Sequence, residues 1–344
     1  MTRKIIIDTD PGQDDAVAIL LAAASPELEV LALVVVAGNV PLAYTRVNAR
    51  KVLELAGRPD IPVYVGCDRP LRRKLVTAEH VHGKTGLDGP DLPPPTMQEQ
   101  SQHGVDYLID TLRREPSGTI TLCPLGPLTN IAMALIKAPD IAPRIAEIVL
   151  MGGAYFEVGN ITQTAEFNIY VDPEAADIVL NSGVRITMIP LDVTHRALAT
   201  QPRLDAIAAI GNQAGRAVSA MLNFSERFDL AKYGWGGAPV HDPNVIAWLL
   251  RPDLYAGRQI NVAVELASEL TLGMTVADYW QITDRPRNVF YVRDVVAQGF
   301  YDLLRRIHPR RDERRAAAHG SVADGAHPGP GCASGAVPRW SRLT

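Results

Sequence analysis

Short apolar runs without polar alternation are the feature that most constrains the fold of this chain. Val30–Val36 is one such run, and Lys4–Asp8 is another that ends in a carboxylate. Strands of this kind are covered by apolar groups on both faces, which is typical of parallel sheets packed between helices. The runs alternate with segments of helical periodicity. We therefore predict an α/β, Rossmann-like fold with a mostly parallel central sheet flanked by helices.

The predicted elements extend to about residue 308, and the Arg-, Ala-, Gly- and Pro-rich segment 309–344 is expected to be a disordered tail. We therefore expect one domain over residues 1–308. Residues 66–100 have little periodicity and are predicted as a long loop. The predicted strands are Lys4–Asp8, Val30–Val36, Pro62–Val65, Thr119–Leu122, Glu147–Met151, Arg185–Ile189, Ile260–Leu266 and Gly273–Ala277. The predicted helices are Asp14–Ala24, Tyr44–Ala56, Ser101–Arg114, Leu128–Ile136, Pro173–Asn181, Leu204–Arg227, Asp242–Leu250 and Val295–Ile307.

The composition excludes several classes of protein. The chain has 34 Lys and Arg against 38 Asp and Glu, a net charge of −4, which is not the charge of a nucleic-acid-binding protein. No apolar stretch approaches the ~20 residues of a membrane helix, and no signal peptide is visible. The three cysteines are far apart and give no disulfide or metal-binding pattern. We expect a cytoplasmic protein without nucleic-acid or membrane partners.

Four aspartates follow the first predicted strand within eight positions: Asp8, Asp10, Asp14 and Asp15. Ligands of open α/β sheets bind at the carboxyl ends of the strands, and this loop lies at such an end. Clustered carboxylates repel one another unless a cation or strong donors compensate them, and oxygen ligands suit Ca²⁺ or Mg²⁺. Helix capping explains one of these carboxylates more readily than all four. The sequence therefore predicts a metal site in this loop.

Two other interpretations of the loop can be judged from its residues. An EF-hand is excluded, because the twelfth positions counted from Asp8 and Asp10 are Ile19 and Leu21 instead of Glu. An apolar strand followed by Asp-x-Asp is also similar to the haloacid-dehalogenase phosphatases, in which Asp8 would be the nucleophile and Asp10 the acid. The residues after Asp10 fit that pattern poorly, but the phosphatase remains an alternative.

Further polar segments follow other predicted strands, where a ligand would bind, and two more lie in the long loop 66–100 and at the start of the helix Asp242–Leu250. Glu166 and Asn168 are predicted on one face of an extended segment, since strand side chains alternate with a period of two. Asp242 is predicted to cap the helix that begins at Pro243. The aromatic residues before it are suited to stacking on a planar ligand, and core packing is the alternative for about half of them. These segments and aromatics contain Asn39, His82, Leu125, Met151, Asn160, Glu166, Asn168, Phe224, Phe228, Tyr233, Trp235, His241 and Asp242.

The nine residues Asp8–Ala16 resemble the signature of the inosine-uridine preferring nucleoside hydrolases, the nucleoside N-ribohydrolases. The other polar segments occur in the order typical of that family, and the resemblance covers about residues 3–308. It implies calcium-dependent hydrolysis of the N-glycosidic bond of ribonucleosides to free base and ribose. It also implies one Ca²⁺ per subunit, and a homodimer or homotetramer. The implied Ca²⁺ ligands are Asp10, Asp15, the Leu125 carbonyl and Asp242.

The resemblance assigns a role to each polar side chain. Water attacks C1′ through an oxocarbenium-like state, with Asp10 as general base and Asn39 aligning the water. His241 is the implied proton donor to the leaving base, with His82 as the second candidate. The implied ribose contacts are Asp14 and Asn168 at the lower hydroxyls, Asn160 and Glu166 at the 5′ end, and Met151 beside the sugar. A nucleoside-binding protein without catalysis remains an alternative, and the choice between purine and pyrimidine stays open.

Overall fold

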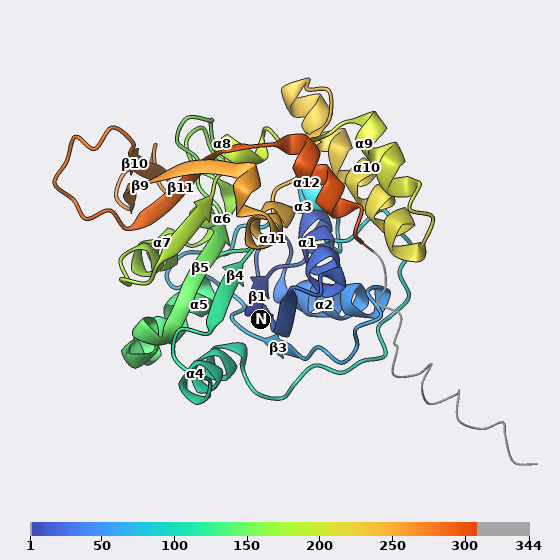
Figure 1. Ribbon diagram of the computed structural model, residues 1–344. Coiled ribbons are helices and arrows are strands. Elements are labelled where there is room, and N and C mark those ends of the chain that lie inside the picture. Colours follow the sequence, from blue (N-terminus) through green and yellow to red (C-terminus); the bar gives the residue numbers. More distant parts are fainter. Residues whose placement is uncertain (1, 308–344) are drawn as a thin grey trace, which may run out of the picture. The chain divides into compact units, whose positions relative to one another are not determined.

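Nine strands form one sheet at the centre of the computed structural model, which describes residues 2–307 (Figure 1). Their order across the sheet is β10-β9-β11-β6-β5-β4-β1-β2-β3. A separate two-stranded sheet joins β7 (Leu198–Ala199) to β8 (Ala238–Pro239). The strands of the large sheet are β1 (Arg3–Thr9), β2 (Leu28–Val35), β3 (Val63–Val65), β4 (Ile120–Pro124), β5 (Ile145–Met151), β6 (Ile186–Ile189), β9 (Tyr255–Val264), β10 (Thr275–Asp278) and β11 (Val289–Val295).

The sheet is parallel from β3 to β11, and only β9 and β10 run antiparallel to their neighbours. The carboxyl ends of the parallel strands therefore meet at one edge. β1 lies between β4 and β2, third from the β3 end of the sheet, and the aspartate loop follows it at that edge. This arrangement confirms the predicted mostly parallel α/β fold.

Helices cover both faces of the sheet, and successive residues of one strand supply two separate cores. Ile5 and Ile7 of β1 pack in one core, whereas Ile6 packs in the other, as the alternation of strand side chains requires. Figure 1 shows helices α1, α2, α11 and α12 on one side of the sheet and α4, α5 and α7 on the other. The helices are α1 (Gln13–Ala24), α2 (Leu42–Leu55), α3 (Glu79–His82), α4 (Gly104–Arg114), α5 (Thr129–Lys137), α6 (Phe167–Val171), α7 (Pro173–Leu180), α8 (Leu191–Thr194), α9 (Gln201–Ala208), α10 (Gln213–Tyr233), α11 (Pro243–Leu250) and α12 (Ala297–Leu304), with 3-10 turns η1 (Pro139–Arg144) and η2 (Pro252–Leu254).

Four local predictions are wrong. The segment Leu204–Arg227 is two helices, α9 and α10, because Gly211 adopts a positive φ of 76° between them. The predicted loop 66–100 contains the short helix α3, and strand β11 was missed. Glu166 and Asn168 do not share an extended segment, since Glu166 precedes α6 and Asn168 lies inside it.

The described residues form one compact unit. Within residues 2–307, no helix is long and apolar enough to cross a membrane. The predicted disordered tail, 309–344, lies outside the described residues.

Candidate active site

Asp15 is fixed by three donors at the start of α1. Its Oδ1 accepts from the Thr9 hydroxyl at 2.5 Å, and its Oδ2 accepts from the Gly12 amide at 2.9 Å. The Asn39 side-chain amide donates to the same Oδ2 at 3.0 Å. The bond to Gly12 caps the first turn of α1, as predicted for an aspartate at this position. Capping and a role in the site are thus combined in one carboxylate.

Asp10 is completely buried between two glycines. Its Oδ2 accepts from the Asn39 backbone amide at 2.6 Å, whereas its Oδ1 has no hydrogen-bond partner among the described residues. A Cβ on Gly38 would lie 2.0 Å from Oδ2, and a Cβ on Gly126 would lie 2.2 Å from Oδ1. The loops after β2 and β4 can pass this close to the carboxylate only because both residues are glycine.

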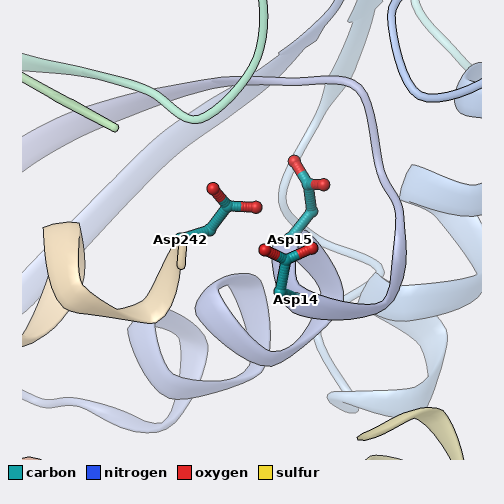
Figure 2. Close-up of side chains that lie close together, drawn as sticks. All are labelled: Asp14, Asp15 and Asp242. Atoms are coloured by element: carbon teal, nitrogen blue, oxygen red, sulfur yellow. The ribbon is translucent and has the colours of Figure 1, made fainter. Parts of the chain in front are cut away.

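Asp14, Asp15 and Asp242 form the acidic cluster, in which one oxygen of each carboxylate lies within 4.8 Å of the others. Figure 2 shows that Asp14 and Asp15 come from the start of α1, and that Asp242 reaches the same space from the start of α11. Asp242 occupies the predicted N-cap position, but its side chain makes no capping hydrogen bond. The structure thus brings Asp14 into the group of possible metal ligands, while Asp10 lies outside that group.

Burial and mutual repulsion disfavour negative charge throughout this region. Burial, followed by the charge of Asp14, raises the pKa of Asp15 to about 7. Burial raises the pKa of Asp10 and of Asp242 well above the usual range, and neighbouring aspartates raise both further. A bound cation would offset the repulsion between these carboxylates and favour their ionised forms. The all-oxygen donors and the partnerless Asp10 Oδ1 fit a hard divalent cation.

Asp8 lies inside β1, before the site begins. Its Oδ2 accepts from the Asn130 side-chain amide at 2.9 Å, and the residue is completely buried. Burial raises the pKa of Asp8 to about 8. Its carboxyl group is therefore largely neutral at pH 7, which is unsuitable for a nucleophile.

Asn168 links the ends of β4 and β5. Its side-chain amide donates to the Leu125 carbonyl at 2.7 Å and to the Met151 carbonyl at 3.3 Å. A carbonyl oxygen has two lone pairs, so Leu125 retains one for another partner. The predicted ligand carbonyl and two predicted ribose contacts therefore lie together.

Glu166 is a buried N-cap that accepts from three backbone amides. Its Oε2 accepts from Gly153 at 3.0 Å and from Ile169 at 3.2 Å, and its Oε1 accepts from Asn168 at 2.9 Å. Burial still raises the pKa of Glu166 to about 7. Asn160, the other residue predicted at the 5′ end, accepts from the Phe167 amide through its side chain at 2.8 Å.

His82 and His241 both line the pocket. The Gln13 side-chain oxygen can only accept, so Nδ1 of His82, 2.6 Å away, carries the proton. Nδ1 of His241 lies 2.8 Å from the Thr194 hydroxyl. Burial lowers the pKa of His82, and it lowers the pKa of His241 to about 4. Both rings are therefore neutral at pH 7.

One pocket brings most of the predicted residues together. Asp10 and Asp15 are not part of its lining, although Asn39, which lines it, donates hydrogen bonds to both. Several residues of the pocket wall, above all His195, were not predicted from the sequence. A signal existed, because the polar segment 192–195 follows a strand end just as the other motifs do. The lining includes Asp14, Asn39, His80, His82, Leu125, Met151, Asn160, Glu166, Asn168, His195, Phe228, Lys232, Tyr233, His241 and Asp242.

Comparison with known proteins agrees with this geometry. Residues 5–302 match the family described as inosine-uridine preferring nucleoside hydrolase. The uncharacterized protein C1683.06c of Schizosaccharomyces pombe is 54% identical over 301 residues, covering 88% of this chain and 97% of that protein. The pyrimidine-specific ribonucleoside hydrolase RihA of Photobacterium profundum is 49% identical, covering 88% of this chain and 98% of that protein. The solved structure of a purine-preferring ribonucleoside hydrolase from Gardnerella vaginalis has a TM-score of 0.83 at 32% identity, over 89% of this chain and 98% of that one. The chain therefore belongs to the inosine-uridine preferring nucleoside hydrolase family and hydrolyses N-glycosyl bonds.

Proposed function

We propose that this enzyme hydrolyses the N-glycosidic bond of ribonucleosides in a calcium-dependent reaction, with Asp10 as the general base. The observation that carries the proposal is the buried Asp10 carboxylate, whose Oδ1 has no partner among the described residues and which lies beside the acidic cluster. The family match sets aside the phosphatase interpretation of Asp8.

The proposed Ca²⁺ ligands are Asp10, Asp15, the Leu125 carbonyl and Asp242, with Asp14 close enough to contribute. All of them offer oxygen, as Ca²⁺ prefers. Bound Ca²⁺ would orient the ribose hydroxyls and lower the pKa of a nearby water. The raised pKa values of Asp15 and Asp242 describe the protein without a cation, in which protons replace the missing positive charge.

The residues around the ribose each have a proposed task. Asp10 removes the proton from the water that attacks C1′, and Asn39, which donates to Asp10 and Asp15, holds both carboxylates in place. Asp14 and Asn168 bind the 2′ and 3′ hydroxyls, and Met151 packs beside the sugar. The 5′ hydroxyl is the proposed partner of Asn160 and Glu166.

His241 is the proposed donor to the departing base. Its pKa of about 4 makes it neutral before the reaction. Negative charge developing on the base favours the protonated ring and so favours hydrogen donation as the bond breaks. His82 is the weaker candidate, because its Nδ1 proton is already directed at Gln13.

The proposed substrate class is the pyrimidine ribonucleosides, with uridine preferred over inosine. The support is that the relative named as pyrimidine-specific is 49% identical, whereas the purine-preferring structure is 32% identical. A homodimer or homotetramer and a cytoplasmic location remain predictions; light scattering of the purified protein tests the assembly.

The deciding experiment measures ribose released from uridine, cytidine and inosine by the full chain. We expect release with Ca²⁺ present, loss after the protein is stripped with a chelator, and recovery when Ca²⁺ is restored. Full turnover by the stripped protein would disprove the calcium requirement. Nucleoside binding without release of ribose would instead indicate a non-catalytic binding protein.

A further inference from the structure

His195 forms part of the pocket wall but has no role in the mechanism described above. It follows α8 directly, and its side chain is only 5% exposed. Its ring centre lies 6.0 Å from that of His241 and 4.8 Å from that of Trp235, which meets it edge-on. His195 therefore lies beside the residue proposed to assist the leaving base.

The orientation of the His195 ring is fixed through Glu157. Nδ1 of His195 lies 3.3 Å from the Glu157 carboxylate, which only accepts, so Nδ1 carries a hydrogen. The segment that holds Glu157 is itself anchored by Asp192, which accepts from the amides of Tyr155, Phe156 and Glu157 at 2.6 to 3.1 Å. The buried Asp192 thus positions the carboxylate that positions the ring.

The other ring nitrogen of His195, Nε2, lacks a hydrogen-bond partner in the described part of the chain. Burial lowers the pKa of His195 more than Glu157 raises it, so the ring is neutral and Nε2 is a hydrogen-bond acceptor. Nε2 is buried and has no hydrogen-bond partner among the described side chains, which do not include those of residues 229–231. An unpaired buried acceptor is costly, and a ligand that donates to it relieves that cost.

We propose that His195 is a specificity-determining residue for the leaving base, and that its Nε2 accepts a hydrogen bond from a base N–H. The inference rests on the proposed nucleoside substrate and adds which edge of the base is recognised. Uracil-type bases carry an N3–H, and the stacked rings of Tyr233 and Trp235, 4.3 Å apart, supply an aromatic surface next to His195. A base that carries a methyl group instead of that hydrogen cannot make the bond.

The test compares kcat/KM for three substrates: uridine, 3-methyluridine, which lacks the N3–H, and 4-nitrophenyl riboside, whose leaving group has no N–H. The variants are His195→Leu, which removes the acceptor, and His195→Gln, which keeps one near the position of Nε2. His103→Leu is the matched control, because His103 is exposed at the start of α4 and lies outside the pocket.

We expect His195→Leu to lower kcat/KM for uridine by roughly 10- to 100-fold. The same variant should change the values for 3-methyluridine and nitrophenyl riboside by less than about threefold, and His195→Gln should recover part of the uridine activity. Equal losses on all three substrates would show a structural role and overturn the proposal, as would unchanged uridine activity. If the wild type hydrolysed no nucleoside, the proposed function would fail; calorimetric binding of uridine and 3-methyluridine to wild type and His195→Leu would then decide the His195 proposal separately.

Discussion

The two ends of the site are built in different ways. At the acidic end, Asp10 and Asp15 lie just beyond β1, and each accepts hydrogen bonds from backbone amides or from Asn39, just beyond β2. At the base end, His195 and Tyr233 lie at the ends of helices α8 and α10, and ring contacts of about 4 to 6 Å hold them together.

We infer from this difference that the acidic end carries out the reaction, whereas the base end selects the substrate. The acidic end lies directly after strands of the sheet, and hydrogen bonds from Gly12 and Asn39 hold its carboxylates in place. The base end depends on side chains at the ends of α8 and α10, which can change without disturbing the sheet. We therefore expect substitutions at the acidic end to affect every substrate, and substitutions at the base end to affect substrates unequally.

Asp10→Ala should have the largest effect. It removes the proposed base, which alone contributes 10²–10⁴-fold, together with a proposed metal ligand, so ribose release should fall by more than about 10⁴-fold for all nucleosides. Asp8→Asn, two residues earlier, is the control, because the buried Asp8 is already largely neutral at pH 7. If Asp10→Ala kept wild-type turnover, the mechanism would be wrong.

Glu166→Gln should flatten the pH dependence of stability. The pKa of Glu166 is raised from 4.5 to about 7 on folding, so the unfolded chain releases this proton first as the pH rises. The contribution of Glu166 to the free energy of unfolding therefore falls as the pH rises from 4.5 to 7, by up to about 3 kcal/mol. Below pH 4.5 and above pH 7 this contribution does not change with pH. Denaturant unfolding of the metal-free wild type and variant at pH 5 and pH 7 measures the difference; identical slopes would contradict it.

Gly126→Ala should impair catalysis although it keeps every proposed catalytic side chain. The added methyl group would lie 2.2 Å from Oδ1 of Asp10 and must displace the carboxylate. A misplacement of about 1 Å costs about 100-fold in rate, for uridine and inosine alike. Gly236→Ala is the control, because a Cβ there meets no atom within 4 Å. Comparable kcat values for the two variants would refute the role of this close approach.

His241→Ala should have the smallest and most selective effect. Hypoxanthine has an N7 acceptor that uracil lacks, so loss of the donor should cost inosine about 100-fold and uridine about tenfold in kcat/KM. Steady-state assays on both substrates measure the ratio. Full activity on both would remove His241 from the role of donor, and an equal loss on both would place it at the ribose end instead.

The sequence by itself determined the sheet and most residues of the site. The apolar runs 5–7 and 30–36 predict buried strands of a parallel sheet. Polar residues directly after parallel strands lie at the same edge of the sheet, independently of how the helices pack. Asp14, Asn39 and Leu125 could therefore be predicted to converge, and the pocket brings them together. Asp242 follows no predicted strand, so its place in the same site was expected only from the resemblance. The roles of these residues came from resemblance to the family.

Only the tertiary structure decided what surrounds those residues. The partnerless nitrogen of His195 and the contact of Glu166 with the Gly153 amide depend on how segments apart in the sequence pack together. Helical periodicity records which face is apolar and carries no such information about which side chain lacks a partner. The burial that raises the pKa values of the aspartates is likewise a property of the packed molecule, because a carboxylate loses its water only when the strands and helices around it have assembled.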